Sequence, residues 1–65
     1  MIDKLYDIVS IHKEDGDRVF IHATSAKNQA MGIAKNIDKS IDECWHVVIL
    51  EFWPTRGHTK MIDIK

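Results

Sequence analysis

The sequence predicts a small α+β domain with the element order β-β-α-β-β, in which a four-stranded, mainly antiparallel sheet carries one helix on one face. Three observations predict this fold. The ten-residue run 44–53 is apolar and rich in β-branched and aromatic residues, which favours a strand. An Asp15-Gly16 turn signal separates two short apolar segments, as in a β-hairpin. Apolar residues recur at helical spacing between positions 26 and 41.

Length and composition narrow the class of protein. With 65 residues the chain is expected to form a single domain, 1–65, with one core layer, because a chain of this size buries only about 60% of its unfolded surface. Nine basic and ten acidic residues argue against an affinity that rests on many phosphate contacts. The single cysteine excludes an intramolecular disulfide, and neither a signal peptide nor an apolar run of about 18 residues is present. We therefore expect a cytoplasmic protein with no membrane partner.

The first hairpin consists of predicted strands at 5–13 and 18–23, and its register depends on the turn. A two-residue Asp15-Gly16 loop pairs odd positions with even ones. A type I turn followed by a bulge at Gly16 pairs odd with odd. We favour the bulged turn, because it gathers aliphatic residues on one face. Apart from Asp7, that face carries Leu5, Val9, Ile11, Val19, Ile21 and Ala23.

The helix is predicted to begin after a cap at Thr24 or Ser25 and to end near Asp42. Its apolar stripe consists of Ala26, Ala30, Ile33, Ala34, Ile37 and Ile41. The small residues Ala30, Gly32 and Ala34 permit a close approach to the sheet. A tight contact or chance accounts for Gly32, which costs about 1 kcal/mol relative to alanine inside a helix.

The second half of the chain is expected to form the strand 44–53, a loop at 54–59 and a short strand at 60–65. This order of elements is similar to that of a β-grasp domain, in which the first and last strands lie in the middle of the sheet. The competing arrangement is two hairpins in one antiparallel sheet. It agrees better with the strongly apolar 44–53 segment and the short last strand.

Catalysis and metal binding are not expected. The four histidines and Cys44 include no pair at the close spacing of a zinc motif. Ser10, His12 and His22 share one face of the first hairpin, but a flat sheet face has no pocket that excludes water. We therefore expect no enzyme activity, no catalytic residues, no cofactor and no metal.

The segment 44–53 is apolar on both strand faces, which predicts that the face away from the helix is also covered. We expect Val48 to face the helix and the opposite face to bind another protein or a second copy of the chain, as a homodimer. The predicted interface residues are Tyr6, Ile8, Phe20, Trp45, Val47, Ile49 and Trp53. The expected function is a small non-catalytic protein-binding module, of the inhibitor or adaptor type that phages and other mobile elements encode.

The alternative function is a module that binds nucleic acid or phosphate through the 53–60 loop. This loop contains no acidic residue. Backbone donors and cations there would hold a phosphate, and the aromatic ring would stack on a base. The residues concerned are Trp53, Arg56, Gly57, His58 and Lys60.

Overall fold

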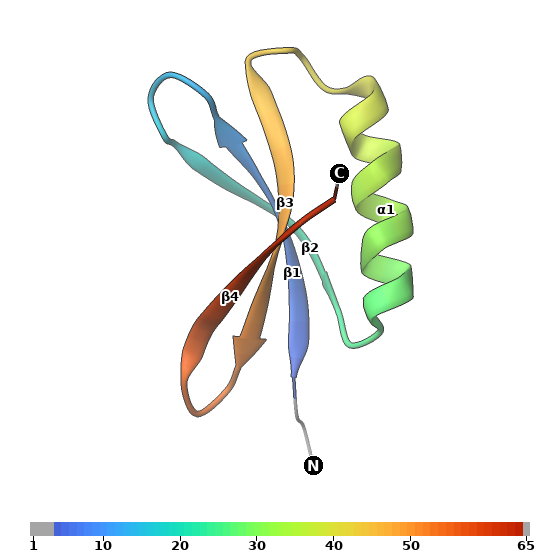
Figure 1. The fold of residues 1–65 in the computed structure, drawn as a ribbon, viewed down its shortest axis with the longest axis vertical. Helices are drawn as coiled ribbons and strands as arrows, with labels where there is room; N and C mark the ends of the chain where they lie inside the picture. Colours follow the sequence, from blue (N-terminus) through green and yellow to red (C-terminus); the bar gives the residue numbers. More distant parts are fainter. Residues whose placement is uncertain (1–3, 65) are drawn as a thin grey trace.

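Four strands and one helix follow one another in the predicted order β-β-α-β-β (Figure 1). The computed structural model describes residues 4–64. The elements are β1 (Leu5–His12), β2 (Arg18–Thr24), α1 (Lys27–Ser40), β3 (Trp45–Trp53) and β4 (Gly57–Asp63). Lys65, where the last strand was predicted to end, lies outside the described residues.

The strands form one antiparallel sheet in the order β2-β1-β3-β4. The predicted arrangement of two hairpins is confirmed, and the β-grasp alternative is wrong, because the first and third strands lie in the middle. The composition of β3 and β4 explains why β3 lies in the middle of the sheet and β4 at its edge. A central strand is flanked on both edges and suits the apolar β3, whereas β4 carries exposed charges at Lys60 and Asp63 that suit an edge.

The register of the β1–β2 hairpin differs from the predicted one near the turn. Near the turn, Ile11 pairs with Arg18 and Val9 pairs with Phe20, so odd positions pair with even ones. Ile21 is then skipped, and the rest of the hairpin has the predicted odd–odd pairing, with Asp7 opposite Ala23. The bulge therefore lies inside β2 and not at Gly16. Gly16 does adopt the expected positive φ, 76°, in a turn that the Gly16 N–H closes by donating to the His12 carbonyl at 2.9 Å.

Helix α1 begins and ends slightly inside its predicted bounds. Its N-cap is Ala26, which has no side-chain cap, and the N–H of Ala26 donates to Thr24 Oγ1 at 3.3 Å. The helix ends at Ser40, where the Ile41 N–H still bonds to the Ile37 carbonyl at 2.9 Å. Ala30 and Ala34 are fully buried against the sheet, as their small size predicts. Gly32 is exposed, and an added Cβ would meet no atom within 4 Å, so chance and not tight packing accounts for it.

The helix covers the face of the sheet opposite to the predicted one. The main core consists of buried Tyr6, Ile8, Val47 and Ile49 beneath Ala30 and Ala34, together with Ile64. Val48, expected to face the helix, belongs to a separate cluster with Val9 and Leu50 on the other face. Asp7 shares that other face, because it lies opposite Leu50 in the sheet. A carboxylate is costly under a helix, which explains why this face of β1 is turned away.

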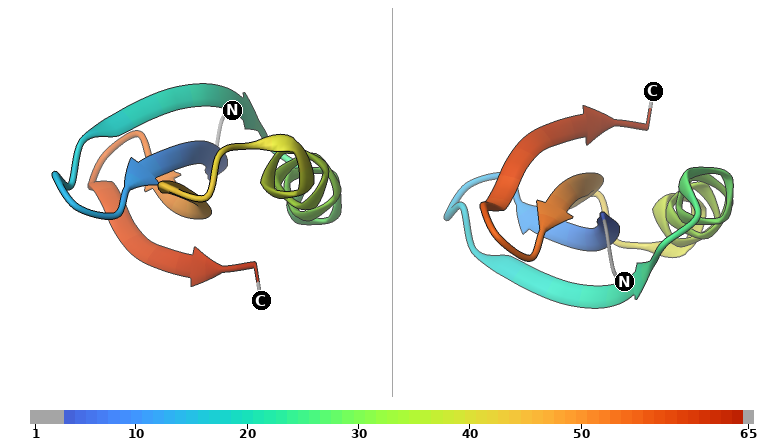
Figure 2. Two further views of the ribbon diagram at one scale, coloured as in Figure 1. Left: turned by 90° about the horizontal axis from the view of Figure 1, so that it is seen from above. Right: turned by 90° about the horizontal axis from the view of Figure 1, so that it is seen from below.

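The two hairpins lean away from the helix at opposite ends of the molecule (Figure 1). Views along the long axis show β1 and β3 in the middle, with β2 and β4 curving away on either side and α1 lying to one side (Figure 2). This twist is the usual consequence of right-handed strands. We call the sheet face that α1 does not cover the open face.

Candidate interaction surface

Four of the seven predicted interface residues, Tyr6, Ile8, Val47 and Ile49, are buried beneath α1. They form the core of the domain and offer no surface to a partner, so the prediction had the two faces of the sheet reversed.

The other three predicted interface residues lie at the margins of the sheet. Trp45 is half-buried, with its ring edge-on to His12 at 4.9 Å between centroids. Trp53 is also half-buried, and its Nε1–H donates to Glu51 Oε1 at 3.3 Å. Phe20 pairs with Val9 and therefore lies on the open face, where 62% of its surface is exposed. Of the predicted set, only Phe20 contributes to an accessible apolar surface.

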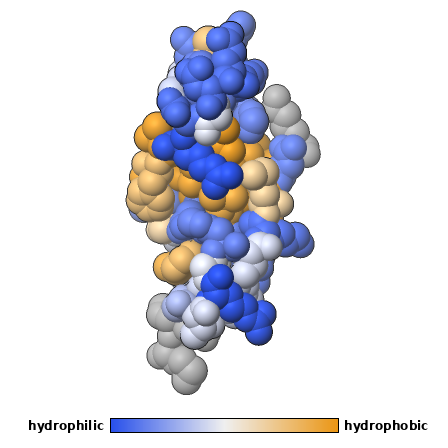
Figure 3. Space-filling view, turned by 90° about the vertical axis from the view of Figure 1, so that its left-hand side faces the viewer, coloured by the Kyte–Doolittle hydropathy of each residue, from blue (hydrophilic) through white to orange (hydrophobic). Residues whose placement is uncertain are grey.

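The open face has an apolar centre. Val9, Val48 and Leu50 pack together there with Ile11, and flanking side chains bury them. Phe20 of β2 and Met61 of β4 border this centre and expose 62% and 51% of their surfaces. Figure 3 shows apolar residues gathered across the middle of this face, crossed by hydrophilic side chains and bounded by hydrophilic ends. The open face thus combines a packed apolar centre with exposed apolar margins.

A histidine–carboxylate pair lies on the open face. His58 Nε2 lies 2.8 Å from Asp7 Oδ2, which links β4 to β1 across the intervening β3. The His58 ring also meets Phe52 edge-on, with centroids 5.2 Å apart. Within residues 4–64, no hydroxyl or thiol forms a hydrogen bond with His58. The pair joins an edge strand to a central strand that it does not touch through the backbone.

Only residues 54–56 of the predicted phosphate-binding loop form the turn of the β3–β4 hairpin, because β4 begins at Gly57 and not at Lys60 as predicted. Lys4 Nζ and Arg56 Cζ lie 5.3 and 5.8 Å from the centre of the Trp53 ring, so cations already contact the ring that was expected to stack on a base. Gly57 has a positive φ of 78°. Lys60 pairs in register with Glu51, and His58 contacts Asp7. Arg56 therefore contacts an aromatic ring of the same chain and His58 contacts a carboxylate, whereas Lys60 is exposed.

Two charged groups near the sheet have shifted pKa values. A hydrogen bond with Tyr6, helped by the charge of Glu51, raises the pKa of Lys4. The N–H of Cys44 donates to Asp42 Oδ1 at 2.9 Å, and this bond lowers the pKa of Asp42. Both shifts have structural causes: the first belongs to the Trp53 cluster, and the second to the turn that leads into β3.

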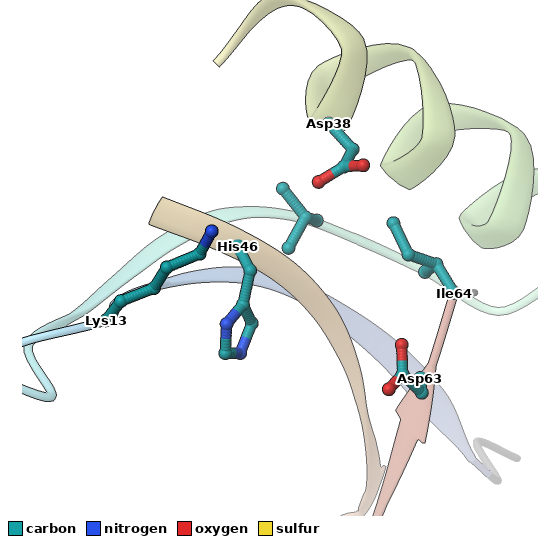
Figure 4. A pocket seen from close by; sticks show the side chains of 6 residues that line it. Lys13, Asp38, His46, Asp63 and Ile64 are labelled. Atoms are coloured by element: carbon teal, nitrogen blue, oxygen red, sulfur yellow. The ribbon is translucent and has the colours of Figure 1, made fainter. Parts of the chain in front are cut away.

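A small hollow lies between the end of α1, the start of β3 and the end of β4 (Figure 4). Its volume is about 200 Å³, and it is lined by Lys13, Asp38, His46, Val47, Asp63 and Ile64. Ligand pockets are typically larger, about 300–1,000 Å³, and mostly apolar. In the described part of the chain, no group of three or more histidine, cysteine, aspartate or glutamate side chains is placed to hold a metal ion.

Comparison with protein-family models, with curated proteins and with solved structures found no match to this chain. In residues 4–64, the helix has neither the length nor the hydrophobicity needed to cross a membrane.

Proposed function

We propose that this protein is a small non-catalytic binding module, of the inhibitor or adaptor type, that captures another protein on the open face of its sheet. The observation that carries this proposal is the exposure of Phe20 and Met61 on that face, on either side of the buried cluster of Val9, Val48 and Leu50. Large apolar side chains with adjacent polar groups are typical of protein-binding surfaces. The exposed thiol of Cys44 is compatible with a reducing compartment such as the cytoplasm.

A photo-cross-linking amino acid at position 61 tests this proposal in cells of the native host. Position 61 lies at the margin of the open face, and we expect a small number of discrete adducts with another protein. The same group at position 35, which is exposed on the helix, is the matched control and should give none of these adducts. Identical adducts from both positions, or none from position 61, would contradict the proposal.

A substitution completes the test. Met61→Lys places a charge at the margin of the open face without disturbing the buried core, because Met61 is half exposed. It should abolish capture of the cross-linked partner while leaving the melting temperature nearly unchanged. Lys35→Ala should preserve both capture and melting temperature.

A further inference from the structure

The free edge of β2 has an unusual pattern of exposed side chains. Val19 and Phe20 are consecutive, and they expose 48% and 62% of their surfaces. Their partners in β1 show that they point to opposite faces: Phe20 lies beside Val9 on the open face, and Val19 lies beside Ser10 on the helix face. A partner docked on either face would cover only one of them. A strand added alongside β2 would cover both.

The backbone of β2 is also available for pairing at this edge. The His12 N–H donates to the Asp17 carbonyl at 2.8 Å, so the backbone of Asp17 points toward β1. Successive residues of an antiparallel strand point their backbone groups to alternate sides. The N–H and C=O groups of Arg18 and Phe20 therefore point away from β1, toward the free edge of the sheet.

The two edges of the sheet differ in their protection against strand pairing. β4 carries Lys60 and Asp63, both exposed, and natural sheets use such charges to block edge pairing. β2 carries one charged residue, Arg18, at its start, and from Val19 to Thr24 it has no lysine, no proline and no acidic residue. Its bulge at Ile21 restricts regular pairing to the part of the strand that precedes it. The unprotected edge is thus short and centred near Val19.

We propose that β2 pairs antiparallel with β2 of a second copy of this chain, with Val19 opposite Val19. This register joins the outward backbone groups of Arg18 to those of Phe20 of the second copy. It also places the Arg18 guanidinium beside that phenyl ring on the open face, where a cation–π contact forms.

Charge complementarity supports a second copy as the occupant. Because the two strands run antiparallel, the turn before one β2 points toward the Thr24 end of the other β2, which leads into α1. The acidic turn with Glu14, Asp15 and Asp17 thereby approaches the start of the second copy's helix. That helix begins at Lys27 and has no acidic residue in its first turn, so its positive end lacks a negative partner within its own first turn. The pairing has two-fold symmetry and uses the same edge of both copies, so it stops at a dimer and leaves no β2 edge unpaired.

This inference does not rest on the proposed capture of another protein: the two surfaces share Phe20, but Val19 belongs only to the β2 edge and Met61 only to the opposite margin of the open face. Edge pairing leaves Met61 accessible and joins the sheets of the two copies into one continuous sheet. Substitutions at Val19 and Met61 therefore separate the two proposals.

Sedimentation equilibrium provides the first test, over concentrations up to about 1 mM, which covers dissociation constants as weak as that value. The mass of the wild-type chain should rise with concentration from 7.5 kDa toward twice that value. Val19→Lys should remain a monomer throughout, because lysine on an edge strand blocks pairing. Met61→Lys, equally exposed on the other edge strand, should dimerise like the wild type. A monomeric wild type, or a Val19→Lys variant that dimerises normally, would overturn the proposal.

Amide hydrogen exchange tests the register without any substitution. When about nine chains in ten are paired, exchange at the N–H groups of Arg18 and Phe20 should be about tenfold slower than in the monomer, since only unpaired chains exchange at those sites. The matched control is Lys60 on β4, whose exchange should not depend on concentration. Dimerisation with unchanged exchange at Arg18 and Phe20 would show that a different surface pairs, and the edge proposal would be wrong.

Discussion

At the scale of single residues, Asp42 shows how one carboxylate organises the entry to β3. Its side chain accepts the N–H of Cys44 at 2.9 Å, and its backbone carbonyl accepts the N–H of Trp45 at 3.0 Å. The bond to Cys44 lowers the pKa of Asp42 below its ordinary value of 3.8. Because the pKa is lower in the folded state than in the unfolded state, Asp42 stabilises the protein at pH values above its unfolded-state pKa. This stability is lost as the pH falls through the folded value.

Asp42→Asn should therefore lower the melting temperature at neutral pH but not well below pH 3.8, where the native carboxylate is protonated as well. The amide keeps an oxygen for the Cys44 N–H but carries no charge. Thermal unfolding followed by circular dichroism at both pH values measures the difference. An equal loss at both would show that the charge of Asp42 does not contribute.

Gly16 isolates the cost of a left-handed backbone. Its φ is 76°, and an added Cβ would meet no atom within 4 Å, so any penalty comes from the backbone and not from a clash. Gly16→Val should reduce the free energy of unfolding by about 1–2 kcal/mol, and Gly16→Asn by less. Urea titration distinguishes the two variants. Equal stability of the valine variant and the wild type would mean that the turn can change conformation freely.

At the scale of elements, α1 contains a glycine whose replacement should stabilise the protein. Gly32 lies on its exposed side with open space around it. Gly32→Ala should therefore raise the free energy of unfolding by about 1 kcal/mol, because alanine restricts the unfolded chain and favours the helix. Lys35→Ala, also exposed on α1, is the control and should change stability far less. Destabilisation by Gly32→Ala would reveal a contact that the geometry does not contain.

The hairpins show which properties of an element follow from sequence. The Asp15-Gly16 signal located the turn, and the positive φ of Gly16 is confirmed. The bulge at Ile21 has no comparable signal, because an aliphatic residue can occupy a regular strand equally well. The bulge changes the pairing parity within β2, so a register extrapolated from the turn does not hold for the rest of the strand.

At the scale of the whole molecule, one chain buries β3 on both sides. Val47 lies under α1, and Val48 lies within the cluster on the open face; both are buried. Val47→Lys and Val48→Lys should each destabilise the domain by more than about 4 kcal/mol, enough to unfold a chain of this size. Circular dichroism of the two variants would measure this. A folded Val48→Lys variant would mean that flanking side chains can open to admit the lysine.

The element order and the central place of β3 were predictable, because apolar content separates central from edge strands. The orientation of the faces was not predictable from β3, since both of its faces are apolar. Asp7 was the available signal: a carboxylate among aliphatic residues marks the face turned away from the helix. The predicted interface was wrong for the same reason: of its residues, only Phe20 lies on the accessible surface.

The pairing of β1 with β3 has a consequence for the kinetics of folding. Each hairpin joins neighbouring segments, but Ile8 meets Ile49 only after the chain has closed a loop that contains β2 and the whole of α1. Loop closure costs entropy before the contact stabilises anything, and such long-range contacts slow folding. We therefore expect both hairpins to form early and fleetingly. The rate-limiting step is then their meeting along the seam between β1 and β3, which makes that seam the nucleus of the fold.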